Sequence, residues 1–230
     1  AVWPLAMLFL ALVTWPRTDG DTLRSALLAG PCAAWALRLG VHLLLRWRAH
    51  GEDRRYADLI GRQMKTGRSW PMVALLFVFL PQGFLAWLTS LPVQLGQVAE
   101  VPPVGWLGWA GVALFALGLV FETVGDAQLA AFRRDPSPSG KVLDTGLWRY
   151  TRHPNYFGDA CVWWGLYLLA AGTGPGLASI LGPIFLTFTL TRWSGAPLLE
   201  GGMKKSRPGY ADYKARTSAF FPRPPKKSAD

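Results

Sequence analysis

Charged side chains are scarce in this sequence. Asp, Glu, Lys and Arg make up 17% of the 230 residues, whereas a soluble domain usually carries about 25%. No spacing indicates a soluble β-rich core. Hydrophobic residues instead make up 51% of the chain and fall in long runs. These features argue against an ordinary soluble domain and predict an all-α fold, a polytopic bundle of transmembrane helices.

Cysteine is scarce as well. The two cysteines, Cys32 and Cys161, both lie in apolar segments, where free cysteines behave as small buried hydrophobes. Nothing in their spacing indicates a disulfide framework or a zinc site, so we predict no bound metal. Internal repeats and low-complexity tracts are also missing. We therefore predict one membrane-embedded domain over residues 1–230, with N-terminal helices in 1–100 and a C-terminal half in 104–230.

Six apolar runs dominate what is present. The predicted spans are 1–15, 23–47, 70–90, 104–132, 156–171 and 177–196. The first is short for a membrane-crossing helix, which needs about 20 residues. The sequence also starts inside that run without an initiator Met. We therefore expect the natural N-terminus to lie upstream, and seven spans in the intact protein.

The positive charge is unevenly distributed. Of the 24 Lys and Arg residues, 20 fall in 46–68, 133–152 and 204–227, whereas 91–101 and 171–176 contain none. Cytoplasmic loops of membrane proteins collect Lys and Arg. Six alternating crossings place all three basic stretches on one side, which we predict to be cytoplasmic. The net charge of +10 thus indicates topology and argues against nucleic acid as a partner.

The fourth predicted span carries ionisable residues. A charge near the bilayer centre costs at least a few kcal/mol, so such groups are candidates for function. Glu122, Asp126 and Arg133 are separated by four and seven residues, and both spacings return to one helical face. Two interpretations remain open. The three form a polar stripe along a cofactor cleft, or the acids pair internally while Arg133 reaches the interface.

Two further groups are ambiguous by themselves. Arg38 and His42 lie one turn apart on the second span, and Trp35 lies one turn earlier. They form either a satisfied internal polar pair or part of a binding pocket. The motif GEDRRY at 51–56 mixes acids with arginines and is equally typical of a solvated charge cluster.

The stretch 141–164, KVLDTGLWRYTRHPNYFGDACVWW, concentrates polar chemistry at the mouth of the fifth span. His153 precedes a proline, which disfavours helix there, and Pro154 suits the first position of a helix. A helix N-terminus beside cations attracts anions; the cations here are Lys141, Arg149 and Arg152. Asn155 and Asp159 add neutral and hydroxyl recognition, which suits a phosphorylated cofactor. The alternative is an interfacial anchor against lipid headgroups.

LDTGLWRYTRHPNYFGD resembles the signature of the membrane-bound steroid 5-alpha-reductase C-terminal family, in the bacterial branch long carried as a domain of unknown function. Sterol C14 reductases share its RHPNYxGD core. GEDRRY and the segment 194–227, SGAPLLEGGMKKSRPGYADYKARTSAFFPRPPKK, also resemble that branch, so the resemblance covers nearly the whole chain. RHPxYxG alone is similar to isoprenylcysteine carboxyl methyltransferases too.

The family reduces an activated carbon–carbon double bond with NADPH in a seven-helix membrane fold. The resemblance thus implies NADPH as cofactor and a steroid or other lipid enone as substrate, most directly the Δ4 bond of a 3-oxo-steroid. It implies cofactor contacts at Glu122, Asp126, Arg133, Lys141, Arg152, His153, Asn155, Tyr156, Asp159, Trp163, Glu200, Lys204, Arg207, Tyr210 and Tyr213. Two departures stand out. Glu122 stands where steroid reductases tend to have Asn, and the tail lacks the His of animal members.

The acid that polarises the enone oxygen is expected to make the largest protein contribution. In the family it lies in the N-terminal helices, within an Asp-x-x-Trp-Gly/Pro motif in this branch. The chain begins AVWP, which resembles that motif without its Asp, so we expect the main acid upstream of Ala1. The catalytic candidates present are Glu52, Asp53 and Tyr56, and the candidates for substrate binding are Trp3, Trp35, Arg38 and His42.

Two other functions stay open. One is an S-adenosylmethionine-dependent methyltransferase of the isoprenylcysteine carboxyl methyltransferase type, and the other is a non-enzymatic membrane or lipid-binding protein. The LDTG lead-in, the acids of the fourth span and GEDRRY favour the reductase. We expect a monomer surrounded by membrane lipids in the bacterial inner membrane, with its cofactor site on the cytoplasmic side.

Overall fold

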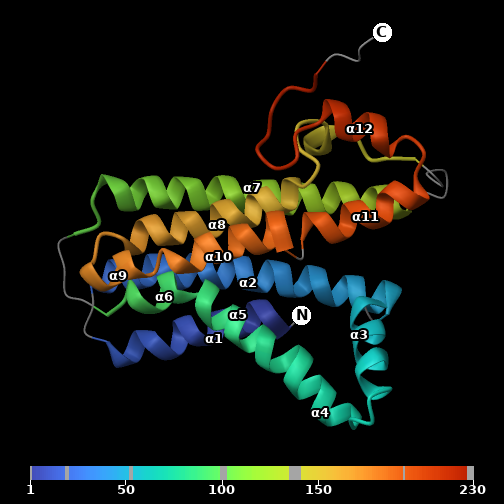
Figure 1. Ribbon diagram of the computed structural model, residues 1–230. Helices are drawn as coiled ribbons and strands as arrows, with labels where there is room; N and C mark the ends of the chain where they lie inside the picture. The colour runs from blue at the N-terminus through green and yellow to red at the C-terminus, as the bar shows by residue number, and fades with distance from the viewer. Residues whose placement is uncertain are drawn as a thin grey trace. The chain divides into compact units, whose positions relative to one another are not determined.

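The computed structural model describes residues 2–18, 21–51, 54–98, 103–134, 141–193 and 195–226. In these ranges the backbone is helical apart from turns and one isolated bridge between Thr151 and Ser218, and it forms no strand (Figure 1). The all-α prediction is therefore confirmed.

The chain divides into two compact units. The first unit comprises Ala1–Gly108 and Leu169–Gly182, and the second comprises Trp109–Leu168 and Pro183–Asp230. The helices, in chain order, are α1 (Val2–Thr14), α2 (Thr22–His50), α3 (Arg54–Met64), α4 (Trp70–Ala74), α5 (Leu80–Thr89), α6 (Leu91–Leu95), α7 (Trp106–Arg134), α8 (Pro154–Ala170), α9 (Gly174–Ala178), α10 (Leu181–Phe188), α11 (Ala196–Ser206) and α12 (Tyr210–Arg216). The π-helical turns Leu75–Phe79 and Thr189–Trp193 connect α4 to α5 and extend α10.

Four helical segments are long and apolar enough to cross a membrane. They are Thr22–Ala49, Trp70–Thr89, Trp106–Arg134 and Gly174–Gly201, and they coincide with the second, third, fourth and sixth predicted spans. The first predicted span forms a shorter apolar helix, Val2–Arg17. The fifth is the 17-residue helix α8. The chain is thus an integral membrane protein whose six predicted segments are all helical.

The core of the first unit forms where α1 packs against α2 (Figure 1). Met7 and Ala11 of α1 and Leu28 and Trp35 of α2 are almost completely buried there. By contrast, α4 and α5 carry exposed apolar side chains, among them Trp70 and Phe84. Apolar side chains exposed along a helix in this way are typical of helices that face lipid.

Two parts of the chain are more ordered than the sequence interpretation held. The basic stretch 46–68, predicted to be a cytoplasmic loop, contains α3, and the basic stretch 204–227 contains the end of α11 and all of α12. In α3 the half-buried residues are Tyr56, Leu59, Ile60 and Gln63. Their spacing of three and four is the pattern of an amphipathic helix, which the charge count had obscured.

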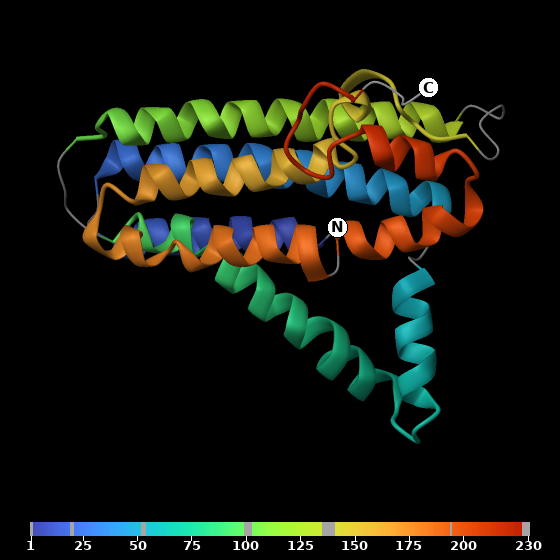
Figure 2. The ribbon, with the colours of Figure 1, turned by 45° about the horizontal axis from the view of Figure 1, so that its top comes forward.

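In the second unit α7 and α8 run side by side (Figures 1 and 2) and meet through glycines. A Cβ on Gly118 would lie 2.6 Å from the carbonyl oxygen of Gly158, and one on Gly165 would lie 2.6 Å from that of Gly111. A Cβ on Gly158 would overlap the backbone nitrogen of Glu122. The helices therefore touch backbone to backbone. We call this contact the glycine seam.

Candidate functional site

Short polar side chains lie along the glycine seam. Glu122 and Asp126 of α7 and Asp159 of α8 are all more than 90% buried. The Asn155 Nδ2 amide donates a hydrogen bond to Asp126 Oδ1 at 3.1 Å. The Asn155 Oδ1 atom accepts one from the Tyr156 N–H at 3.1 Å. The pair fixes the orientation of the Asn155 amide. Glu122 and Asp126 are buried together against α8, whereas Arg133, which was predicted to share their face, is exposed.

The start of α8 follows from its local sequence. The helix begins at Pro154 as predicted, because proline needs no partner for a backbone N–H at the first helical position. His153 stays outside the helix, and its carbonyl accepts the first helical hydrogen bond from Phe157 at 3.0 Å. Gly125 of α7 leaves room for Pro154 and Asn155, since a Cβ there would lie 3.1 Å from the Asn155 nitrogen.

The LDTGLW motif, which lies in the loop before α8, packs against α7. Gly146 adopts φ 59°, in the left-handed region that favours glycine, and any side chain there would overlap Gln128. The Leu147 N–H donates to Gln128 Oε1 at 3.0 Å. The Trp148 indole N–H donates to the Gly125 carbonyl at 3.1 Å. The motif therefore fixes the chain that leads into α8 beside Gly125 and Gln128 of α7.

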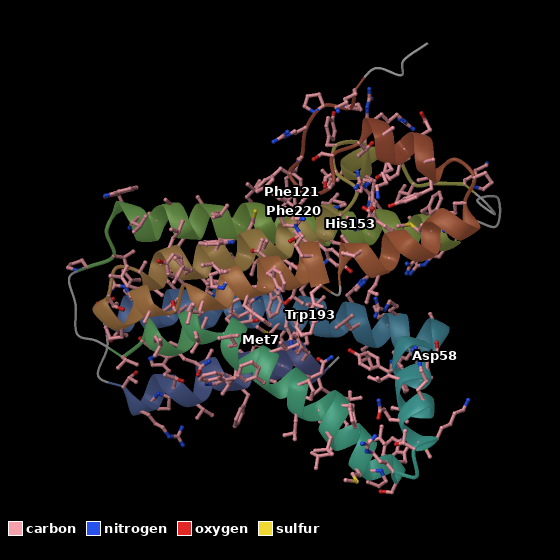
Figure 3. All side chains as sticks on the ribbon, in the orientation of Figure 1. Met7, Asp58, Phe121, His153, Trp193 and Phe220 are labelled. Carbon is pink, nitrogen blue, oxygen red and sulfur yellow. The ribbon has the colours of Figure 1, made fainter. Side chains whose placement is uncertain are left out.

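Four charged or ionisable side chains meet beside this entry. The Arg152 Nε donates to Glu200 Oε1 at 2.9 Å, and the Lys214 Nζ donates to Glu200 Oε2 at 2.8 Å. The His153 Nε2 lies 3.2 Å from Glu200 Oε1. We call Arg152, His153, Glu200 and Lys214 the Glu200 cluster; Figure 3 labels His153 within it. It joins the start of α8 to α11 and α12.

Arg152 is also bonded to the backbone at the end of α12 and just beyond it. Its Nη1 donates to the Thr217 carbonyl at 2.7 Å and to the Lys214 carbonyl at 3.3 Å. Its own N–H donates to the Ser218 carbonyl at 2.9 Å. Arg152 was predicted to contact the cofactor phosphates, but its described hydrogen bonds all go to the protein's own C-terminal segment.

Aromatic rings fasten the same C-terminal segment to α8. Phe220 and Phe221 pack edge-on against Phe157 of α8, with ring centroids 5.9 and 6.1 Å away. Phe157 also meets Phe121 of α7, with ring centroids 5.2 Å apart; Figure 3 labels Phe121 and Phe220. The Thr151 hydroxyl donates to the Phe220 carbonyl at 2.8 Å. The end of the described chain therefore forms a wall over the first turns of α8.

The two predicted tyrosines of the C-terminal segment, Tyr210 and Tyr213, are buried in α12. The Tyr213 hydroxyl donates to the Trp148 carbonyl at 2.6 Å. Tyr210 is 1% exposed, and its hydroxyl lies beside Arg152 and Glu200. Burial raises the pKa of Tyr210 to about 12, so its hydroxyl stays protonated at neutral pH.

The other predicted cations lie near the end of α7. Arg207 places its guanidinium 5.6 Å from the centroid of the Phe132 ring, and its Nη1 donates to the Lys141 carbonyl. The side chains of Arg133 and Lys141 are exposed there. Positive charge at a helix C-terminus is favourable, and these three residues remain accessible to an anion. The side chain of Lys204 lies outside the described residues.

Trp163 is fully buried on α8, one turn beyond Asp159. His153 stacks on Tyr156, with ring centroids 5.3 Å apart and an interplanar angle of 11°. The predicted cofactor residues on described side chains thus all belong to the second unit. The structure gathers them around the start of α8 and the neighbouring end of α7.

The remaining candidates belong to the first unit. Trp3 meets Trp35 edge to face at 6.0 Å. Arg38 and His42 are half-buried on α2. Tyr56 of α3 accepts a hydrogen bond from the Gln82 amide of α5. The sequence interpretation missed Gln82, although it is the one amide in the apolar segment Trp70–Thr89. Glu52 and Asp53 lie outside the described residues.

The polar and charged side chains of the site in the second unit are of the kinds that bind a dinucleotide. Carboxylates and one oriented amide lie on the glycine seam, where they can bind hydroxyl and carboxamide groups. Exposed cations at the end of α7 suit phosphates. Among the described residues, His, Cys, Asp and Glu form no group that could hold a metal ion.

The fold and site define an all-α integral membrane protein with a polar site between two closely packed helices. The chain belongs to the family described as a protein of unknown function, DUF1295, which matches residues 1–217. It is similar to an uncharacterized protein of Schizosaccharomyces pombe, C594.04c, with 22% identity over 218 residues, covering 82% of this chain and 60% of that protein. The chain thus spans less than two thirds of that relative's length. No solved structure matches it.

Proposed function

We propose that the chain is an NADPH-dependent membrane reductase of an activated carbon–carbon double bond. Its substrate class is a 3-oxo-Δ4-steroid or a related lipid enone. The observation that carries the proposal is the Asn155–Asp126 hydrogen bond on the glycine seam, flanked by buried Glu122 and Asp159. The resemblance of RHPNYFGD to the steroid reductase signature supports it, because Asn155 and Asp159 both belong to that motif.

The seam residues have one role in this proposal. Asp126 orients the Asn155 amide, which leaves that amide preorganised for a second polar contact. The carboxylates of Glu122 and Asp159 accept hydrogen bonds from ribose hydroxyls or from a carboxamide N–H. Because these groups are fixed on two helices whose backbones touch, their geometry changes little on binding.

The cations have another role. Arg133, Lys141 and Arg207 hold the phosphates, since each is a side chain that solvent can reach around the end of α7. The positive end of the α8 helix dipole adds to this attraction for anions. NADPH, when bound, supplies the hydride. Trp163 and the wall of Phe220 and Phe221 exclude water from the buried half of the site.

Substrate activation is assigned to the first unit. Trp3, Trp35, Arg38 and His42 line the lipid pocket in this proposal. Tyr56 accepts its hydrogen bond from Gln82, so its own O–H proton is available to an enone oxygen. Tyr56 is therefore the donor to the enone oxygen in this proposal. The cofactor side is cytoplasmic by the distribution of Lys and Arg, in a bacterial inner membrane.

Thermal stability in detergent tests cofactor choice. A ligand that binds only the folded state stabilises it by about 2.7 kcal/mol at 100 times its Kd. We expect NADPH to raise the Tm, NADH to raise it less, and S-adenosylmethionine to leave it unchanged. An increase with S-adenosylmethionine but not with NADPH would overturn the proposal in favour of the methyltransferase.

Two variants test the site itself. Asn155→Ala and Asp159→Ala should abolish most of the NADPH-dependent rise in Tm and the NADPH-dependent reduction of progesterone or testosterone. Gln94→Ala is a matched control, since that amide is hydrogen-bonded to Trp87 and Ser90 in the first unit and takes no part in the site. Wild-type turnover in both site variants would refute the assignment.

A further inference from the structure

The geometry points to Glu200 and Arg152 as positioning residues, not as cofactor contacts. They hold the segment that leads into α8 and so fix His153 and Asn155 for binding. The inference rests on the proposed function, in which Asn155 binds NADPH. Its structural basis is the Glu200 cluster.

Glu200 already binds three donors within the protein. Its Oε1 faces Arg152 Nε at 2.9 Å and His153 Nε2 at 3.2 Å, and its Oε2 accepts from Lys214 Nζ at 2.8 Å. A carboxylate has about four lone-pair sites. Three of these are used by side chains of the protein, and only 12% of the Glu200 side chain is exposed. Glu200 is therefore placed to organise its neighbours and has little capacity left for a ligand.

Arg152 is used in the same way. Its Nε and Nη1 and its backbone N–H are bonded to Glu200, to two carbonyls and to Ser218. The bonded partners lie between 48 and 66 residues away in the sequence. Arg152 thus ties the entry of α8 to α11, α12 and the segment beyond α12. A guanidinium suits this task because its donors are rigidly arranged.

A continuous set of contacts leads from this cluster to the seam. His153 is 1% exposed; one ring nitrogen faces Glu200 and the ring face lies on Tyr156. Tyr156 donates its N–H to the side chain of Asn155, which in turn bonds Asp126. A change at Glu200 therefore reaches the Asn155 amide through two residues, without Glu200 touching the ligand.

The same region offers a matched control pair. Arg216 of α12 binds Asp144 at 2.6 Å, and the two side chains are 27% and 37% exposed. This pair also fastens α12 to the loop before α8, but it makes no described contact with His153, Tyr156 or Asn155. Asp144→Asn removes one carboxylate charge there, as Glu200→Gln does in the cluster.

Hydrogen exchange of the ligand-free full chain is the first measurement. Glu200→Gln should speed amide exchange across 152–157 by about tenfold, because the hydrogen bonds that close this segment lose their support. Asp144→Asn should leave exchange in 152–157 at the wild-type rate. Equal exchange in wild type and Glu200→Gln would overturn the positioning role.

Kinetics are the second measurement. A positioning loss weakens ground-state and transition-state binding equally, so Glu200→Gln should raise the KM for NADPH by about tenfold with little change in kcat. Loss of kcat at unchanged KM would overturn the inference. Should Glu200→Gln fail to fold, the double variant Arg152→Met with Glu200→Met removes both buried charges, which is often tolerated. A wild-type KM in that variant would also overturn it.

The two proposals fail differently. If NADPH does not stabilise the wild-type protein, the proposed function is wrong, and the exchange comparison still decides whether Glu200 positions the entry of α8. If NADPH stabilises the wild type and Glu200→Gln changes neither exchange nor KM, the reductase stands and the positioning role is wrong.

Discussion

Two polar groups flank the first turn of α8, and they are held in opposite ways. On the seam, Asn155 and Asp126 are short side chains that meet because the helix backbones touch. In the Glu200 cluster, long charged side chains join segments that are far apart in the sequence. The first arrangement depends on the distance between two helices. The second depends on the balance of buried charge.

Because of this difference, the two groups should be sensitive to different kinds of substitution. A single added methyl group can push α7 and α8 apart, because the seam has no space for a Cβ. The cluster tolerates small changes of shape, since Arg and Lys have flexible side chains, but a buried charge without its partner is strongly destabilising. Changes of size should therefore disturb the seam, and changes of charge should disturb the cluster.

The largest effect is expected for Gly158→Ala. Its Cβ would overlap the Glu122 backbone nitrogen and lie 2.6 Å from the Gly118 carbonyl, and neither backbone atom can rotate away. We expect a loss of about 3 kcal/mol in the free energy of unfolding, at the upper end for overpacking, together with loss of NADPH binding. The measurements are Tm in detergent and its shift with NADPH.

Gly83→Ala is the control for that substitution. Gly83 lies within α5, and a Cβ there meets nothing within 4 Å, so alanine should stabilise the helix slightly through its higher propensity. If both alanine variants behaved alike, the seam would not be a close contact.

Local signals in the sequence predicted much of this structure. The apolar runs identified the four long membrane helices. The His-Pro step identified the start of α8, and the spacing of Glu122 and Asp126 identified their common buried face. Each of these features is set by neighbouring residues, through hydrophobicity, proline geometry or helical period.

The remaining features depend on contacts between distant residues. Gly111, Gly118 and Gly158 are unremarkable singly, and only the pairing of α7 with α8 gives them a common role. Likewise, nothing near Glu200 in the sequence shows that it meets Arg152, 48 residues away. The assignment of Arg152 as a phosphate ligand considered its charge and its motif, but not the carbonyls that the C-terminal segment brings to it.

Breaking the cluster should have the next largest effect. Arg152→Met leaves Glu200 with Lys214 and His153 as partners, so the carboxylate is only partly compensated. We expect a loss of about 2 kcal/mol in the free energy of unfolding, below the range for a fully buried pair. Restoration of part of this loss when Glu200→Met is added would confirm that charge imbalance is the cause. A double variant less stable than Arg152→Met alone would contradict it.

A smaller coupling is expected between Asn155 and Asp126. Their hydrogen bond joins the amide to a carboxyl oxygen at 3.1 Å, and a hydrogen bond within a protein contributes about 0.5–1.5 kcal/mol net. In a double-mutant cycle with Asn155→Ala and Asp126→Ala, we expect a coupling free energy of about 1 kcal/mol. Denaturation in detergent measures it. A coupling near zero would show that the two side chains act independently, and the seam would then not preorganise the amide.

The smallest effect on stability is expected in the first unit. Tyr56→Phe removes one hydroxyl and leaves the Gln82 amide without that acceptor, which should cost about 1 kcal/mol or less because the pair is only partly buried. The NADPH-dependent rise in Tm should stay at the wild-type value, since every described cofactor candidate belongs to the second unit. Steroid turnover should fall through kcat, because the proposed donor to the enone oxygen is lost. Asp58→Asn is a matched control, as Asp58 is exposed on the same helix. A fall in NADPH affinity with unchanged turnover would reverse the division of roles between the two units.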